Sequence, residues 1–190
     1  MASTAEPLSE SDTLHLSYPL GFAYFPRALQ SFLSLHHLTW LDLRSSLLTE
    51  GLPLDMESLN WWQAGGYPTY AWDHITLALS RIFSVDPVAF FVPDWEGALL
   101  AGGDFPRDRT FGQLFCTYLL PGEGAKVARA LTAAGFQTKR QSVSYWRMGV
   151  LPRHGLALIP TLATILGCPL SHLVPLIATP VGHAYPGVAK

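Results

Sequence analysis

The stretch that decides the fold is TKRQSVSYWRMGVLP, residues 138–152. At about 100° per residue it predicts a helix over residues 139–148, with Val143 and Trp146 on the side that faces a core. The other side carries four residues that can all donate hydrogen bonds: Arg140, Gln141, Ser144 and Arg147. The pattern therefore indicates a short helix with a narrow apolar face and a hydrogen-bonding one.

The ends of this helix are also marked in the sequence. Thr138 is the expected N-cap, Gly149 the expected C′ glycine, and Pro152 prevents the helix from continuing. Its polar face suits the major groove of DNA, where Arg reads guanine edges, Gln reads adenine edges and Ser serves either. The alternative is an ordinary amphipathic surface helix, and the rest of the chain has to distinguish the two.

Charge is distributed unevenly along the 190 residues. Only 14% of the residues are charged, against roughly 25% in ordinary soluble proteins. Residues 1–105 hold three Lys/Arg against twelve Asp/Glu, whereas residues 106–190 hold nine against two, so that charges of −9 and +7 give the net −2. Such asymmetry is expected when one half meets a polyanion and the other does not.

The first half predicts a series of helices. Periodic apolar positions and turn residues place them over residues 24–38, 40–48, 54–63, 71–83 and 87–92. No stretch shows sustained strand alternation, so the expected fold class is all-α. Cys116 and Cys168 lie within apolar helical patterns and are expected as small core residues, with no disulfide or metal role.

The second half repeats this order. Residues 48–68 align without a gap on residues 132–152, at an offset of 84. The matched pairs are Leu47/Leu131, Gly51/Gly135, Ser58/Ser142, Trp62/Trp146, Gly65/Gly149, Pro68/Pro152 and Ile75/Ile159. Beyond these pairs, a one-residue slip sets residues 79–87 against residues 162–170. Trp, Gly and Pro matched at one spacing indicate an internal repeat.

Each copy resembles the helix-turn-helix family of lambda repressor and Cro, often called the XRE family. Residues 143–152 follow the pattern of that family's recognition helix and its exit, and LATILGCPLSHL follows its closing helices. The turn before residue 142 is longer than the family's, and Arg147 stands where the family commonly has Glu. Pro160 is tolerated only in a first turn, so the fourth helix of the second copy is expected to start late.

The resemblance implies two five-helix, lambda-repressor-like helix-turn-helix domains in tandem. The expected segments are an N-terminal tail over 1–20, an acidic domain over 21–92, a Gly/Pro/Asp-rich linker over 93–109, a basic DNA-binding domain over 110–178 and a C-terminal tail over 179–190. The acidic domain is expected to mediate dimerisation or another protein contact.

The candidate DNA contacts belong to the second copy. Phosphate contacts are expected from Lys126, Arg129, Lys139, Arg140 and Arg153, with Arg107 and Arg109 extending the track. Base edges are expected to be read by Arg140, Gln141, Ser144 and Arg147. Two alternatives remain, that Arg147 pairs with Glu123 and that Lys139 is only a solvated helix start. Val143, Trp146 and Leu131 are assigned to the core.

The corresponding helix of the first copy has no cation. Its solvent face is expected to hold Met56, Glu57, Asn60 and Gln63, preceded by Asp55. Carboxylates near a duplex repel phosphates and release no counterions, so this copy is poorly suited to DNA. A weaker alternative is that Asn60 and Gln63 read bases while arginines elsewhere hold the backbone.

The first copy instead has an excess of aromatic residues. Exposed aromatics with few charges are typical of association surfaces, and the candidates for protein interaction are Trp61, Tyr67, Tyr70 and Trp72. The alternative is that these rings pack across the linker onto the second copy. Dimerisation would place two reading helices on one duplex, spaced by about 34 Å or a multiple of it.

The sequence thus predicts a sequence-specific DNA-binding transcriptional regulator, prokaryotic or from a phage, acting as a homodimer. No secretory signal or membrane-spanning stretch is visible, so a cytoplasmic location is expected. No metal, cofactor or enzymatic activity is expected, because no catalytic or phosphate-binding motif is present. The alternative is a protein–protein adaptor, such as an anti-repressor or an assembly factor, that uses both repeats as scaffolds without binding DNA.

Overall fold

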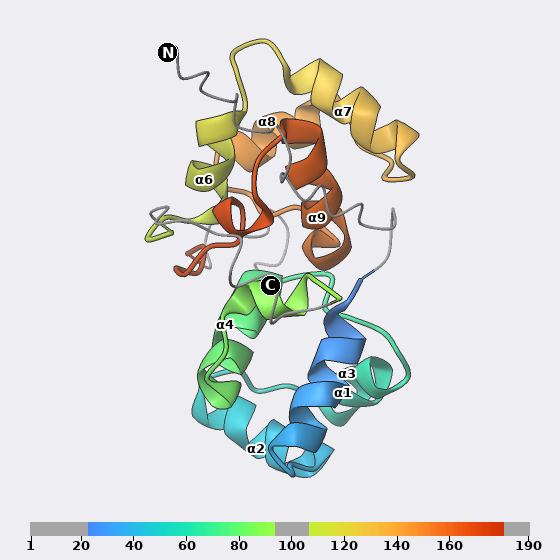
Figure 1. Cartoon of the computed structure of the whole chain (residues 1–190), viewed down its shortest axis with the longest axis vertical. Helices are drawn as coiled ribbons and strands as arrows, with labels where there is room; N and C mark the ends of the chain where they lie inside the picture. The colour runs from blue at the N-terminus through green and yellow to red at the C-terminus, as the bar shows by residue number, and fades with distance from the viewer. Residues whose placement is uncertain (1–22, 94–106, 181–190) are drawn as a thin grey trace, which may run out of the picture.

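The computed structural model describes residues 23–93 and 107–180, and all secondary structure within those two ranges is helical. The elements are α1 (Phe25–Leu35), α2 (Trp40–Thr49), α3 (Met56–Gln63), α4 (Trp72–Phe83), the 3₁₀ helix η1 (Pro87–Phe90), α6 (Phe111–Tyr118), α7 (Gly124–Ala133), α8 (Arg140–Arg147), α9 (Gly155–Leu166) and the 3₁₀ helix η2 (Leu170–His172) (Figure 1). The predicted tail over 1–20, most of the linker over 93–109 and most of the tail over 179–190 lie outside the described residues.

The two halves form two helical bundles stacked along the long axis of the molecule (Figure 1). The first half holds α1 to η1 and the second half holds α6 to η2. No helix in the described part of the chain is long and apolar enough to cross a membrane.

The helix bounds repeat from one half to the other. α2 and α7 begin 84 residues apart, as do α3 and α8, whereas α4 and α9 begin 83 residues apart. The one-residue slip therefore lies between Pro68 and Trp72, before the fourth helix. The predicted pairing of Ile75 with Ile159 is thus wrong, because Ile75 corresponds to Leu158 in the structure.

The turns repeat as well. Ten of the described residues have a positive φ, and they fall into pairs 83 to 85 residues apart: His37/Gly122, Gly51/Gly135, Gly65/Gly149, Ala71/His154 and Ser84/Gly167. Left-handed backbone is unfavourable for residues with a Cβ and common only for glycine. His37, Ala71, Ser84 and His154 nevertheless adopt a left-handed backbone, each at the position equivalent to a left-handed residue of the other half. The two halves therefore have the same turn geometry despite different residues.

The core side of α8 agrees with the periodicity of its sequence. Val143 and Leu131 are fully buried and Trp146 is 6% exposed, which confirms their predicted place in the core. Gly149 follows the helix with φ of 96°, as expected for a C′ glycine. The predicted N-cap is wrong: Lys139 is the capping residue, and the Thr138 hydroxyl instead donates to the carbonyl oxygen of Phe136.

Pro160 lies in the middle of a helix, not in its first turn. α9 begins at Gly155, five residues earlier, so the expectation of a late start is wrong. Proline lacks the N–H that would donate to the carbonyl oxygen of Leu156. Nine of the twelve residues of α9 are buried, and helices in proteins are stabilised mainly by such packing. Packing around α9 thus outweighs the lost hydrogen bond.

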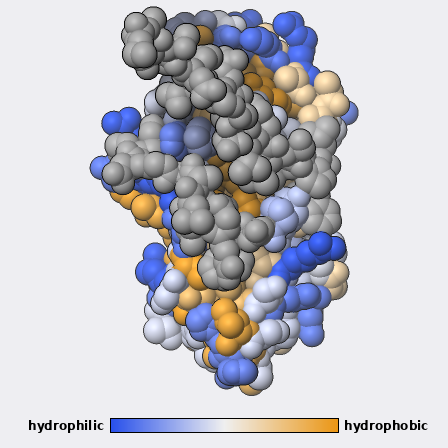
Figure 2. All heavy atoms as spheres, viewed as in Figure 1, coloured by the Kyte–Doolittle hydropathy of each residue, from blue (hydrophilic) through white to orange (hydrophobic). Residues whose placement is uncertain are grey.

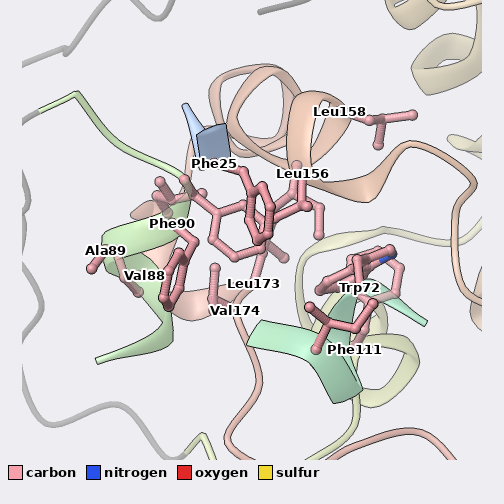
Figure 3. Packing of buried hydrophobic residues seen from close by; sticks show 14 of the residues in the cluster. Phe25, Trp72, Val88, Ala89, Phe90, Phe111, Leu156, Leu158, Leu173 and Val174 are labelled. Carbon is pink, nitrogen blue, oxygen red and sulfur yellow. The ribbon is translucent and has the colours of Figure 1, made fainter. Parts of the chain in front are cut away.

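Trp72 joins the two halves. Its side chain is fully buried, and its indole N–H donates to the carbonyl oxygen of Pro152 over 3.1 Å. The ring meets Phe111 edge-on, with 5.8 Å between ring centroids, and lies against the backbone of Gly155. Figure 3 shows Phe111 beside Trp72, and Leu156 close to Phe25. Side chains of both halves therefore form one continuous core.

Equivalent residues of the two halves touch one another at this junction. Trp72 lies on its equivalent, Gly155, and the guanidinium of Arg153 lies 4.7 Å from the ring centroid of its equivalent, Tyr70. Contacts between equivalent positions are the mark of an isologous arrangement, as in a two-fold dimer. The halves thus pack like two subunits, except that a large ring meets a glycine.

The end of the described chain returns to the first half. The buried carboxylate of Asp73 accepts the backbone N–H of Thr179 over 2.7 Å, and the His74 ring nitrogen Nε2 lies 2.7 Å from the Thr179 carbonyl oxygen. Arg107 forms an ion pair with Asp86 and donates to the carbonyl oxygen of Val174 over 2.8 Å. These polar contacts reinforce the apolar junction.

We predict that Gly155→Ala lowers the free energy of unfolding by about 1–3 kcal/mol, the usual result of overpacking a core. A Cβ at Gly155 would lie 2.2 Å from the Trp72 indole nitrogen. The matched control is Gly124→Ala, also at the first position of a helix, where the new Cβ would lie 3.6 Å from a Val143 methyl. Urea unfolding followed by circular dichroism should show this control unchanged or more stable. Equal destabilisation of both variants would contradict the prediction.

Candidate nucleic-acid interface

All eight predicted DNA contacts are exposed in the structure. They are Lys126, Arg129, Lys139, Arg140, Gln141, Ser144, Arg147 and Arg153. Seven of them lie on or beside α7 and α8, which pack against each other. The eighth, Arg153, lies beyond the C-terminus of α8. In Figure 2, hydrophilic and mildly apolar residues lie side by side over the end of the molecule that holds α7.

The core of the second half holds α8 in place from behind. The Trp146 ring meets Phe115 of α6, with 6.0 Å between centroids. Gly112 allows a close approach of the two helices, since a Cβ there would lie 2.8 Å from the Trp146 carbonyl oxygen. With Val143 and Trp146 buried, the residues between them on the helix face solvent. The solvent face of α8 is therefore presented by a rigidly packed helix.

The described part of the chain does not neutralise the cations of α8. Arg140 and Arg147 form no ion pair with any residue of 23–93 or 107–180. The alternative pairing of Arg147 with Glu123 does not occur, because Glu123 pairs with Lys126 over 3.4 Å. The Lys126 side chain is 76% exposed, and exposed pairs of this kind contribute little. Lys126 therefore remains accessible to a phosphate.

The start of α8 is unusual for a helix. Lys139 is its N-cap, Arg140 its first residue, and its first turn holds no acidic residue. The N-terminus of a helix carries a partial positive charge, so cations there oppose helix formation. Lys139 and Arg140 thus do not stabilise α8. An anion bound at this end would relieve the repulsion.

A shallow depression of about 530 Å³ lies between α7 and α8. It is lined by Ala125, Ala128, Arg129, Thr132, Ala133, Thr138 and Arg140. The backbone N–H of Thr138 donates to the Thr132 hydroxyl over 3.2 Å, which ties the turn before α8 to α7. Arg129 and Arg140 therefore line one surface together with three alanines.

Two of the predicted cations are held by the first half. Arg107 was expected to extend the phosphate track, but its side chain is only 11% exposed in its ion pair with Asp86, so that expectation is wrong. Arg153 is exposed, but it stacks over the ring of Tyr70. Arg109 is exposed and has no ion pair within the described ranges. The available cationic surface is thus that of α7, α8 and Arg109.

The corresponding face of the first half has the opposite character. Met56, Glu57, Asn60 and Gln63 are exposed on α3, as expected. The carboxylate of Asp55 caps α3 by accepting the Ser58 backbone N–H over 2.7 Å, and this hydrogen bond holds the pKa of Asp55 below its usual value. Asp55 is therefore ionised at neutral pH, and α3 begins with negative charge where α8 begins with positive charge.

Three of the four predicted protein-interaction residues contact the second half instead. Trp72 is fully buried, so its assignment to an exposed surface is wrong. Tyr67 is half-buried against the His154 ring, with 6.2 Å between centroids, and Tyr70 holds Arg153. Of the four, Trp61 alone faces solvent without such a contact, with 60% of its area exposed. For the other three, the alternative of packing onto the second copy is the one observed.

An exposed apolar stripe on α2 was missed in the sequence. Leu41 and Leu48 are each 62% exposed, and they lie seven residues apart, on one side of the helix. The buried leucines of α2 are Leu43 and Leu47, on its other side. Apolar residues on both sides of one helix were the available signal, because a helix that covers a single core needs only one such face.

Comparison of the chain with known protein families, with curated protein sequences and with solved structures finds no match in any of the three. Within the described residues, no cluster of three or more His, Cys, Asp or Glu side chains could hold a metal ion. The candidate interface therefore rests on its own geometry and charge.

The two cysteines should differ in reactivity. Cys116 was expected in the core but is exposed, with its sulfur 3.6 Å from the carbonyl oxygen of Arg147. Burial raises the pKa of the Cys168 thiol to about 12. Since the thiolate is the reactive form, iodoacetamide at pH 8 should modify Cys116 well before Cys168. Peptide mass spectrometry would measure both rates, and comparable rates in the folded protein would contradict the expected burial.

Proposed function

We propose that the second half binds duplex DNA sequence-specifically through α8, and that the chain is a transcriptional regulator. The observation that carries this proposal is the positive charge on one exposed face of α7 and α8, including the start of α8, which it destabilises. Arg129, Arg140 and Arg147 on this face form no ion pair within residues 23–93 and 107–180. The equivalent face of the first half lacks this charge. A surface of this kind is suited to a polyanion.

We further propose that both halves are degenerate helix-turn-helix domains of the lambda repressor type. Support comes from the repeated order of four α-helices and a 3₁₀ helix, and from the contact of α7 with α8. Six residues, 134–139, separate these two helices, more than in the compact turn of that family. Because this turn sets the angle between the helices, the depth at which α8 enters the groove is expected to differ from that family's.

Phosphate and base contacts divide between the two helices. Arg129 and Lys139 lie at the side and the start of the interface, where they would meet the backbone of the duplex. The base-reading residues are proposed to be Arg140, Gln141, Ser144 and Arg147. Gln141 and Ser144 now bond locally, to the Tyr145 hydroxyl and the Arg140 carbonyl oxygen. Both are exposed, so these bonds can be exchanged for base edges.

Two chains are proposed to act on one operator. Each chain presents a single cationic reading helix, and one such helix would bind DNA weakly. Half-sites about 34 Å apart, or a multiple of this, would place two reading helices on the same side of the duplex. The first half is proposed to mediate assembly, although three of the four aromatic residues considered for this role are engaged within the chain.

The second candidate function is a protein–protein adaptor that does not bind DNA. The observation that favours it is the exposed apolar stripe of Leu41 and Leu48 on a chain with few charges. An adaptor would use the two helical halves as scaffolds for partner proteins. DNA binding by the cationic face of α8 separates the two candidates directly.

We predict that Arg140→Ala/Arg147→Ala weakens binding to a selected DNA site by roughly a hundredfold. Each base contact is worth about 1–3 kcal/mol, or roughly tenfold or more. The matched control is Arg44→Ala/Arg81→Ala, which removes the same charge from exposed positions of the first half. Fragments selected from random DNA, followed by fluorescence anisotropy, would measure both. Equal affinity of the two double variants, or no binding by wild type, would favour the adaptor.

We predict that Arg129→Ala and Gln141→Ala act differently on DNA binding. Removing a phosphate contact should weaken all sequences alike and reduce the slope of log K against log salt by about 0.9. Loss of a base contact should leave this slope unchanged and relax the preference at one base pair. Anisotropy titrations at several salt concentrations, with sequencing of selected sites, would test both. A change in base preference for Arg129→Ala would contradict the assignment.

A further inference from the structure

The exposed face of α8 carries a hydrogen bond between two side chains. The amide nitrogen Nε2 of Gln141 donates to the Tyr145 hydroxyl over 2.7 Å, and both residues are exposed. They lie four residues apart, so they are neighbours on one side of the helix. Gln141 is a proposed base-reading residue, whereas Tyr145 is not among the proposed DNA contacts. The bond therefore joins a residue of the interface to one with no role assigned to it.

Tyr145 has an aromatic equivalent in the first half. At the offset of 84 it corresponds to Trp61 on α3, which is also exposed. The turns that follow the two helices have the same backbone hydrogen bond. The N–H of Gly66 donates to the carbonyl oxygen of Trp61 over 2.8 Å, and the N–H of Val150 donates to that of Tyr145 over 3.0 Å. The local backbone around the two rings is therefore alike.

The two rings nevertheless lie in different places, and one residue of the turn accounts for this. A Cβ at Gly66 would lie 2.2 Å from the Trp61 ring atoms Cε2 and Nε1, so the Trp61 ring covers the backbone of this glycine. Val150 has a Cβ at the equivalent position, which fills that place in the second half. The Tyr145 ring is thus kept off the turn, and its hydroxyl meets Gln141 one helical turn back.

This hydrogen bond leaves the Gln141 amide in a state that suits adenine. A glutamine amide offers two N–H donors and a carbonyl oxygen. With one N–H directed to Tyr145, the second N–H and the oxygen remain available. These are the two groups that pair with N7 and N6 of adenine in the major groove, so reading the base does not require the bond to break. Holding a long side chain in its bound conformation lowers the entropy that binding costs.

We propose that Tyr145 is a positioning residue, whose hydroxyl orients the Gln141 amide and thereby raises the preference for adenine at the base pair that Gln141 reads. This inference rests on the proposed function. It names the base that one residue of the interface selects and the neighbour on which the selection depends. Because Tyr145 acts through Gln141, it should add nothing to specificity in a chain without that glutamine.

Tyr145→Phe in the full chain tests the inference, because it removes the hydroxyl and keeps the ring. The matched control is Trp61→Phe, at the equivalent exposed position of the half that is not proposed to read bases. Each protein would select sites from random DNA for sequencing. Wild type should prefer adenine at one base pair, and Gln141→Ala should abolish this preference. Tyr145→Phe should weaken it about threefold, and Trp61→Phe should leave it unchanged.

The double variant Gln141→Ala/Tyr145→Phe separates positioning from direct contact with DNA. If Tyr145 acts through Gln141, the double variant should bind and select sites as Gln141→Ala does. A hydroxyl that itself bound a phosphate would instead weaken binding to all sequences, with and without Gln141. An equal loss of affinity in both backgrounds would overturn the proposal, as would an adenine preference that Tyr145→Phe leaves unchanged.

Positioning is also measurable in the free protein. In ¹⁵N relaxation, the order parameter of the Gln141 side-chain amide should be higher in wild type than in Tyr145→Phe, because the hydroxyl restrains it. The side-chain amide of Gln63, exposed on α3, is the internal control and should be the same in both proteins. Equal order at Gln141 in the two proteins would overturn the proposal whether or not DNA binds.

The two measurements distinguish this inference from the proposed function. If wild type binds no DNA while Tyr145→Phe loosens the Gln141 amide, the proposed function fails together with the reading of adenine, and the positioning of Gln141 by Tyr145 stands. If wild type binds DNA with an adenine preference that Tyr145→Phe does not change, the inference alone fails.

Discussion

The packing of Trp72 onto Gly155 and Pro152 is the constraint that gives this molecule its shape. A ring of this size, fully buried with its N–H bonded, excludes water and holds the helices α4 and α9 together. The two halves contribute residues of very different size to this contact, because a Cβ at Gly155 would occupy the space of the Trp72 ring. Two identical halves could not fill this junction in the same way: two tryptophans would collide and two glycines would leave a void. The junction therefore requires different residues at this pair of equivalent positions in the two repeats.

The same difference extends to the surface, where the backbone is shared and the chemistry is not. Left-handed residues recur at equivalent turns of the two halves, but α7 packs against α8, whereas α2 and α3 are not among the helix pairs that pack together. In the first half, Thr39 and Asp55 cap their helices and stabilise them. In the second, Lys139 and Arg140 oppose the helix dipole, by about 0.3–1 kcal/mol each. An anion bound at this end of α8 would remove that cost.

The spacing of apolar residues correctly predicted burial that depends on a single helix. It failed where a segment distant in the sequence determines whether a side chain is buried. Val143 and Trp146 were assigned correctly because the spacing of apolar residues states which side of α8 is buried. The same spacing does not state what covers that side. Trp72 was therefore predicted as exposed and Arg107 as a phosphate contact, although a glycine 83 residues away and the carboxylate of Asp86 are their partners. The place of Pro160 was predicted wrongly for the same reason. Burial of α9 stabilises the helix enough to accept a proline in its interior, which the local rule for proline excludes.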